Sequence, residues 1–274
     1  MVSLSTENLQ IGYGNKVIVE GLNLEINKGQ ITTIIGANGC GKSTILKTIA
    51  RVHPAKSGSI YLDGKMIHKI PTREIAKKMA VLPQSPEVPT GLTVYELISF
   101  GRSPHQSGFG RLSNEDKRVI DWVLDVTGLS DFADRPVDAL SGGQRQRAWI
   151  AMAIAQETDL LLLDEPTTYL DMAHQLEILQ LLEKLNREEG RTIVMVIHDL
   201  NLAARFSHHM AALRAGNLVK EGTPEEVMTQ NVLKEVFQID AEIVKDPRTK
   251  KPVCLSYDLI QKHQQSDKQK VVNF

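Results

Sequence analysis

The sequence has few cysteines, no excess of basic charge and no long apolar run, and each absence excludes a class of protein. Its 274 residues contain two cysteines, Cys40 and Cys254, so no disulfide framework is indicated and a reducing cytosol is expected. The net charge of −1 shows no excess of basic residues of the kind that binds nucleic acid, so no nucleic-acid partner is expected. The longest apolar stretch, residues 148–155, is far shorter than the roughly 20 residues of a membrane span. Residues 1–10 lack a signal-peptide pattern, so secreted, fibrous and membrane-spanning proteins are excluded.

The spacing of apolar residues predicts an α/β chain. Residues 31–35 form a compact β-branched run that suits a strand buried on both faces. A second set of strand and helix patterns follows residue 141, which favours a parallel core sheet. Strands are expected at residues 4–11, 17–19, 22–26, 31–35, 59–62, 65–67, 79–82, 160–163 and 192–197, and helices at 42–51, 94–100, 115–126, 142–156 and 175–187.

The stretch from residue 86 to about residue 140 differs from its surroundings because it has helical patterns and no β-rich run. We therefore expect a helical insertion within the α/β domain. Residues 238–257 predict a terminal hairpin that turns at Asp246-Pro247, and the polar residues 261–270 are expected to fray.

A glycine-rich segment follows the strand expected at residues 31–35 and fits the spacing G-x-x-x-x-G-K-[ST]. The glycines let backbone amides turn toward phosphate oxygens, and the next helix directs its positive end at them. Lys42 is expected to reach the β- and γ-phosphates and the Ser43 hydroxyl to bind Mg²⁺. The predicted phosphate loop comprises Gly36, Ala37, Asn38, Gly39, Cys40, Gly41, Lys42, Ser43 and Thr44.

The thiol of Cys40 lies in this loop, just before a helix N-terminus, where the thiolate form is favoured. We therefore expect Cys40 to react with alkylating agents and ATP to protect it. Cys254, on a candidate strand, is expected to show no such protection.

Two carboxylates, Asp164 and Glu165, follow the fully apolar strand expected at residues 160–163. Ligands of open parallel sheets sit beyond the carboxyl ends of the strands, so both acids are expected beside the phosphates. Asp164 is expected to bind Mg²⁺, directly or through water, and Glu165 to polarise the attacking water.

A second glycine motif, Ser141-Gly142-Gly143-Gln144, opens the helix expected at residues 142–156. Its bare amides and hydroxyl at a positive helix end predict a second anion site, although one loop already suffices for one triphosphate. A simple helix cap explains Ser141 but does not account for both glycines.

The sequence resembles the ATP-binding cassette (ABC) family over about residues 2–230. The resemblance rests on the order of five features: the phosphate loop, Gln84, the Ser141 motif, the Asp164-Glu165 pair and His198. The resemblance implies an α/β phosphate-loop fold with an N-terminal antiparallel β subdomain, a mixed or parallel core sheet and an inserted helical subdomain. The implied division is an ABC domain at 1–237 (core 1–85 and 145–237, helical subdomain about 86–144), a β-hairpin extension at 238–260 and a polar tail at 261–274.

The resemblance also implies roles for single residues. Tyr13 matches the aromatic residue that stacks on adenine, although a tyrosine at a strand edge is the plain alternative. Gln84 matches the glutamine that contacts Mg²⁺ and water, and His198 the switch histidine that contacts the γ-phosphate. Asp171 matches the loop that crosses the dimer interface. The family signature, which closes on the γ-phosphate held by the opposite subunit, corresponds to Ser141, Gly142, Gly143 and Gln144.

A narrower resemblance, to bacterial ferric-siderophore importers, rests on Cys40 and on residues 98–105, 164–171 and 246–252, although that family more often has glycine near Lys250. Cobalamin and haem importers share much of this pattern. The resemblance implies an ATPase subunit that works as a homodimer on the cytoplasmic face of a membrane. A separate permease and, indirectly, an external substrate-binding protein are the implied partners, and ATP and Mg²⁺ the cofactors.

Two other classes of ATPase remain as alternatives. A nucleic-acid-associated ABC ATPase usually carries a longer insertion or a second cassette, and the neutral charge argues against it. A small-molecule kinase shares the phosphate loop but has no use for the Ser141 motif or His198. The pair His208-His209 is not expected to bind metal, because adjacent residues of a strand point to opposite faces.

Overall fold

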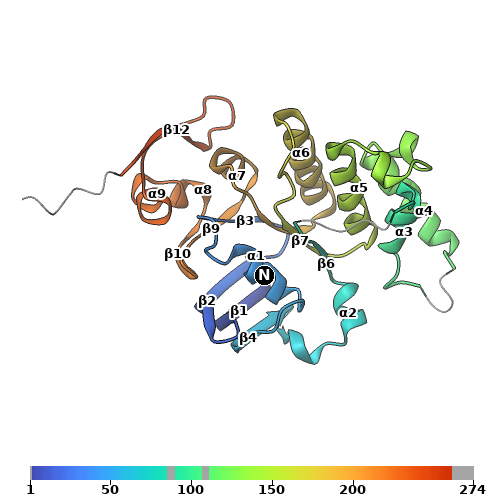
Figure 1. Ribbon diagram of the computed structural model, residues 1–274, viewed down its shortest axis with the longest axis horizontal. Helices are drawn as coiled ribbons and strands as arrows, with labels where there is room; N and C mark the ends of the chain where they lie inside the picture. The colour runs from blue at the N-terminus through green and yellow to red at the C-terminus, as the bar shows by residue number, and fades with distance from the viewer. Residues whose placement is uncertain (1, 85–89, 107–110, 261–274) are drawn as a thin grey trace, which may run out of the picture.

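The core of the molecule is a six-stranded sheet with the order β10-β9-β3-β8-β7-β6 in the computed structural model, which describes residues 2–84, 90–106 and 111–260 (Figure 1). Strands β9, β3, β8, β7 and β6 run parallel, and β10 is antiparallel to β9. The predicted mixed or parallel core sheet is therefore confirmed. Its strands are β3 (Ile31–Gly36), β6 (Met79–Leu82), β7 (Leu160–Asp164), β8 (Thr192–Val196), β9 (His209–Arg214) and β10 (Asn217–Gly222).

Strands β3, β7 and β8 are buried along their whole length, as their uninterrupted apolar and β-branched sequences require. Because the strands are parallel, their carboxyl ends meet at one edge of the sheet. The phosphate loop follows β3, Glu165 follows β7, and Gln84 lies two residues beyond β6. The sheet thus gathers these three parts of the predicted site along this edge.

A smaller antiparallel sheet with the order β2-β1-β4-β5 packs on one face of the core sheet, with helix α1 (Lys42–Ile49) between them (Figure 1). Ile45, Leu46 and Ile49 of α1 are buried among residues of both sheets. The two strands expected at residues 17–19 and 22–26 are one strand, in which Gly21 has a φ of +64°. The strands are β1 (Val2–Tyr13), β2 (Lys16–Asn27), β4 (Ser57–Leu62) and β5 (Lys65–Met66), followed by a 3₁₀ turn at Ile67–Lys69 and helix α2 (Thr72–Ala76).

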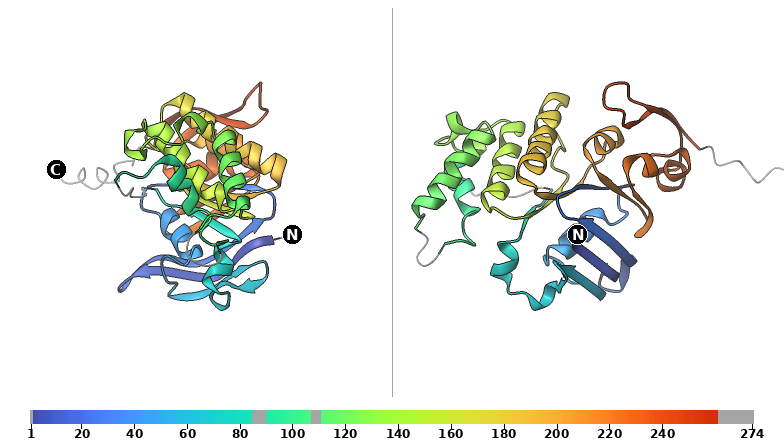
Figure 2. Two further views of the ribbon diagram at one scale, coloured as in Figure 1. Left: turned by 90° about the vertical axis from the view of Figure 1, so that its right-hand side faces the viewer. Right: turned by 180° about the vertical axis from the view of Figure 1, so that it is seen from behind.

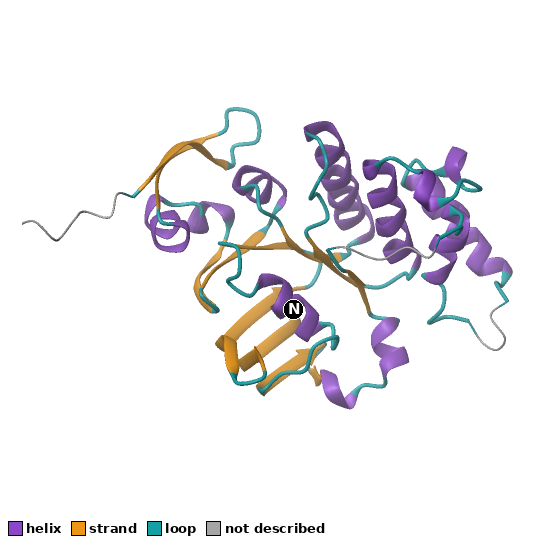
Figure 3. Cartoon of the chain, in the orientation of Figure 1, coloured by secondary structure: helices purple, strands orange, loops and turns teal. Residues whose placement is uncertain are grey.

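Helices cover the other face of the core sheet (Figures 2 and 3). Within the predicted insertion, the described residues form helices and two 3₁₀ turns, and one isolated β-bridge joins Thr93 to Pro136. Residues 85–89 and 107–110 of that region lie outside the described part of the chain. The helices are α3 (Val94–Phe100), α4 (Asn114–Val126), α5 (Gly142–Ala155), α6 (Met172–Glu189) and α7 (Leu200–Phe206), with 3₁₀ turns at Ser130–Phe132 and Val137–Ala139.

Arg102 joins this helical layer together from the inside. Its side chain is 3% exposed, and its Nε lies 2.8 Å from Oδ1 of Asp116. Its Nη1 donates to the carbonyl oxygen of Ala155 at 2.7 Å and to Oε2 of Glu157 at 2.6 Å. Arg102, which belongs to the segment that resembles siderophore importers, therefore fastens the end of α3 to α4 and to the end of α5.

The predicted terminal hairpin is present at the end of the molecule far from α4 (Figure 1). It follows helices α8 (Pro224–Val227) and α9 (Gln230–Phe237) and consists of β11 (Ile239–Lys245) and β12 (Pro252–Leu259). Asn201 of α7 exchanges two hydrogen bonds with the backbone of Cys254 and so ties the hairpin to the core. Lys250 has a φ of +62°, a conformation that favours the glycine expected there from the resemblance. The tail at 261–274 lies outside the described residues.

Candidate functional site

The phosphate loop turns tightly between β3 and α1, and its shape depends on glycine at both ends. A Cβ on Gly36 would lie 2.4 Å from the carbonyl oxygen of Leu213, and Gly41 has a φ of +105°. The buried ammonium group of Lys42 donates to the carbonyl oxygens of Gly36 and Ala37 at 2.8 and 3.1 Å. It is therefore held over the loop, where it can meet a phosphate.

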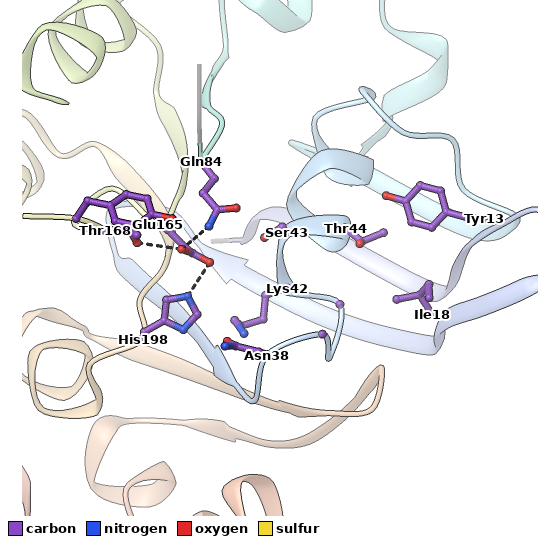
Figure 4. A pocket seen from close by; sticks show the side chains of 13 residues that line it. Tyr13, Ile18, Asn38, Lys42, Ser43, Thr44, Gln84, Glu165, Thr168 and His198 are labelled. Atoms are coloured by element: carbon purple, nitrogen blue, oxygen red, sulfur yellow. Dashed lines mark hydrogen bonds and ion pairs between the residues drawn. The ribbon is translucent and has the colours of Figure 1, made fainter. Parts of the chain in front are cut away.

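A cavity of about 540 Å³ opens at this loop (Figure 4). The loop supplies one wall, Tyr13 lies at one end, and Glu165 and His198 lie at the other. Thr168, Tyr169 and Ile18 also line the cavity, although no motif of the sequence marks them. The full lining is Tyr13, Ile18, Asn38, Gly39, Gly41, Lys42, Ser43, Thr44, Gln84, Glu165, Thr168, Tyr169 and His198.

Asp164 lies beside Ser43, whose hydroxyl donates to its Oδ1 at 2.8 Å. The other carboxylate oxygen, Oδ2, is buried and has no partner among the described residues. Burial is the main cause that raises the pKa of Asp164 above its usual value. A hydroxyl and a buried carboxylate with a free oxygen, next to a phosphate loop, form the kind of oxygen donor set that Mg²⁺ takes. The residues present therefore fit this ion.

Glu165 contacts three other polar side chains of the cavity. Its Oε2 accepts hydrogen bonds from Nε2 of Gln84 at 2.6 Å and from the hydroxyl of Thr168 at 2.9 Å. Nε2 of His198 lies 2.6 Å from its Oε1. Burial raises the pKa of Glu165, but these hydrogen bonds outweigh it and hold the pKa below its usual value. The carboxylate is therefore ionised near neutral pH and is able to accept a proton.

The second glycine motif lies away from the cavity of its own chain. Ser141 caps α5 reciprocally with Gln144, as the helix-cap alternative expects. A Cβ on Gly143 would lie 2.6 Å from the His174 ring, so packing against α6 explains this glycine. A Cβ on Gly142 would meet nothing within 4 Å, so packing does not explain the glycine at this position. Asp171 caps α6, accepts from the backbone N–H of His174 at 2.9 Å and does not line the cavity.

The expected accessibility of Cys40 is wrong. The residue is 4% exposed, and its Sγ lies 4.0 Å from Nζ of Lys42, beneath the loop. Gly36, Ala37 and Cys40 belong to the loop but do not line the cavity. Cys254 is buried as well, and burial raises the pKa of its thiol. Both thiols are therefore shielded from alkylating agents in the folded chain.

His208 immediately precedes β9, and its Nδ1 accepts the backbone N–H of Ile31 at 3.1 Å. Burial, and then the charge of Lys251, lower its pKa below the usual value of 6.5. Among the described residues, no group of three or more His, Cys, Asp or Glu side chains is placed to hold a metal ion. We therefore interpret His208 as a neutral histidine that accepts a hydrogen bond from the backbone of β3.

This histidine predicts a pH-dependent stability. The unfolded chain takes up the His208 proton below about pH 6.5, whereas the folded chain resists it, so acidification favours unfolding. The stabilising effect is present above that pH and is lost below it. His208→Gln keeps an acceptor for the backbone N–H of Ile31 but does not titrate. When the pH is lowered from about 7.5 to 5.5, this variant is expected to lose less unfolding free energy than the wild type. Urea titrations at both pH values check this, and equal losses in both proteins would refute it.

The parallel sheet, the phosphate loop and the acid pair at the sheet edge together define a phosphate-loop ATPase. The ABC transporter family model matches residues 19–168. Accordingly, the chain belongs to the ABC transporter family and is one of its ATP-binding, ATP-hydrolysing subunits, as the sequence predicted.

Individual relatives are similar to this chain over most of its length. FhuC of Bacillus subtilis (strain 168), an iron(3+)-hydroxamate import ATP-binding protein, is 70% identical over 95% of this chain and 97% of its own length. FepC of Escherichia coli (strain K12), a ferric enterobactin transport ATP-binding protein, is 45% identical over 92% and 93%. The dimeric ATP-binding cassette MJ0796 bound to ADP and Pi superposes with a TM-score of 0.70 at 31% identity, over 80% of this chain and 98% of its own.

Within the described residues, no helix is both long enough and apolar enough to cross a membrane.

Proposed function

We propose that this chain is the ATP-hydrolysing subunit of an importer of ferric hydroxamate siderophores, working on the cytoplasmic face of the membrane with a separate permease. The observation that carries the proposal is the 70% identity to FhuC over nearly the whole of both chains. The cavity supports it because residues of the phosphate loop and Glu165 line it, and because Ser43 of the loop donates a hydrogen bond to the buried Asp164 behind the lining. An external substrate-binding protein would deliver the cargo to the permease.

The residues of this chain divide the work at the cavity. Tyr13 stacks on adenine at one end, while the loop amides and Lys42 hold the phosphates. Ser43 and Asp164, with Gln84, would hold Mg²⁺, which supplies positive charge against the phosphate oxygens. Glu165 accepts a proton from the attacking water, and His198 leaves Glu165 to contact the γ-phosphate.

The Ser141 motif supports a homodimer. Gly142 has open space around it, at the positive end of α5, and the motif does not line the cavity of its own chain. A second copy that brings this helix end to the γ-phosphate would account for Gly142 and complete the site. Asp171, exposed at the start of α6, would lie on the same contact face.

The Lys42→Ala variant tests the proposed function in cells. Because a subunit that cannot hold the phosphates cannot drive uptake against a gradient, we expect loss of radiolabelled ferric hydroxamate uptake under iron limitation. Binding of the chelate outside the cell is expected to persist. Lys65→Ala, at an exposed position on β5, is the matched control and is expected to leave uptake unchanged.

Other outcomes would select another function. Lost uptake of cobalamin or haem, with every ferric chelate still imported, would replace the cargo and keep the importer. Phosphate found on an acceptor molecule instead of in solution would identify a kinase. ATP turnover that rises with DNA would identify a nucleic-acid-associated ATPase.

A further inference from the structure

A second aromatic ring lies behind Tyr13. The centroids of the Tyr13 and His53 rings are 4.4 Å apart, and the ring planes are tilted by 39°. Tyr13 is 52% exposed and lines the cavity, whereas His53 is half-buried and does not line it. His53 therefore contacts the Tyr13 ring from outside the cavity, and the Tyr13 ring still lines the cavity.

The segment that carries His53 also fixes the backbone on both sides of Tyr13. Nε2–H of His53 donates to the carbonyl oxygen of Gly12 at 3.1 Å, so this nitrogen carries the proton. Nζ of Lys56 donates to the carbonyl oxygen of Gly14 at 2.6 Å. The backbone N–H of Lys56 donates to the carbonyl oxygen of Gln10 at 2.8 Å. Three hydrogen bonds thus hold the end of β1 where Tyr13 projects.

This segment is continuous with the phosphate-binding helix. Helix α1 begins at Lys42 of the loop, and the backbone N–H groups of Val52 and His53 donate to the carbonyl oxygen of Lys47 near its end, at 2.9 and 3.1 Å. One stretch of chain therefore holds the phosphates at its start and supports Tyr13 at its end. Because the covalent structure of ATP sets the distance between adenine and phosphates, the protein gains affinity when both supports are held in place beforehand.

We propose that His53 is a positioning residue that holds the Tyr13 ring in the orientation that stacks on adenine. The ring contact carries this role, and the hydrogen bonds of His53 and Lys56 fix the backbone. The inference rests on the proposed function only in taking ATP as the ligand and Tyr13 as its base contact.

The test distinguishes contacts to the adenine of ATP from contacts to its phosphates. Binding of ATP and of inorganic tripolyphosphate to the purified full chain is measured by calorimetry. His53→Ala is expected to weaken ATP binding about three- to tenfold, the effect of losing one aromatic contact. Tripolyphosphate affinity is expected to stay unchanged. His53→Phe, which keeps a ring, is expected to restore ATP binding, and His53→Gln, which keeps a donor for Gly12 without a ring, is not.

A double-mutant cycle completes the test. In a Tyr13→Ala background, His53→Ala is expected to cause no further loss, because its effect passes through Tyr13. Unchanged ATP affinity in His53→Ala, an equal loss for tripolyphosphate, full rescue by Gln, or an additive double variant would each overturn the role of His53. Thermal unfolding of each variant identifies a general loss of folding. A wild-type chain that binds no ATP would instead refute the proposed function.

Discussion

Replacing Glu165 with Gln is expected to lower ATP turnover by about 10²- to 10⁴-fold while ATP still binds. Gln matches the shape of the side chain, but its amide cannot take a proton from water. The other groups around the cavity, including Lys42 and Tyr13, are unchanged and continue to hold the nucleotide. Phosphate release by the purified complex with its permease measures turnover, and calorimetry measures binding.

The variant also tests the coupling between hydrolysis and dimer opening. If closure needs the γ-phosphate and opening needs its loss, Glu165→Gln is expected to accumulate as an ATP-bound dimer, visible by size-exclusion chromatography. Glu235→Gln, at an exposed position on α9, is the matched control and is expected to keep wild-type turnover and to show no ATP-bound dimer. Turnover near the wild-type rate in Glu165→Gln would contradict the assigned role.

The parts of the site that follow from local sequence were predictable. The loop at residues 36–44 has a fixed spacing because its backbone must wrap phosphates, and β7 shows its burial as an unbroken run of leucines. The acid pair then lies at the strand end by geometry alone. These features depend on neighbours in the chain, and such neighbours are visible in a single sequence.

Other features depend on how the backbone turns locally or on contacts between residues far apart in the chain. Thr168 contacts Glu165 only because the backbone after β7 turns sharply, with a φ of +55° at Glu165. Cys40 was predicted to be accessible because it belongs to a ligand-binding loop, but the loop folds over its side chain. The helix expected at residues 175–187 begins at Met172, because Asp171 caps it. The support of Tyr13 by His53 joins residues that no sequence pattern connects.

Arg102 shows the same limit most clearly, and its removal is expected to have the largest effect on stability. Arg102→Ala leaves Asp116, whose side chain is 6% exposed, without a charge partner, and also removes the hydrogen bonds to Ala155 and Glu157. Breaking a buried ion pair from one side costs about 3–5 kcal/mol of unfolding free energy. Urea titration of the full chain measures this loss.

Two further variants separate the buried pair from charge in general. Arg118→Ala removes an exposed arginine of α4 that pairs with Glu115 at 2.7 Å, and is expected to cost less than about 1 kcal/mol. Replacing both partners, Arg102→Met with Asp116→Leu, leaves no buried charge and is expected to cost less than the sum of the single changes. Since Arg102 lies outside the cavity, ATP affinity of the folded variant is expected to match the wild type. A loss in Arg102→Ala no larger than in Arg118→Ala would show that the buried pair does not hold the helical layer.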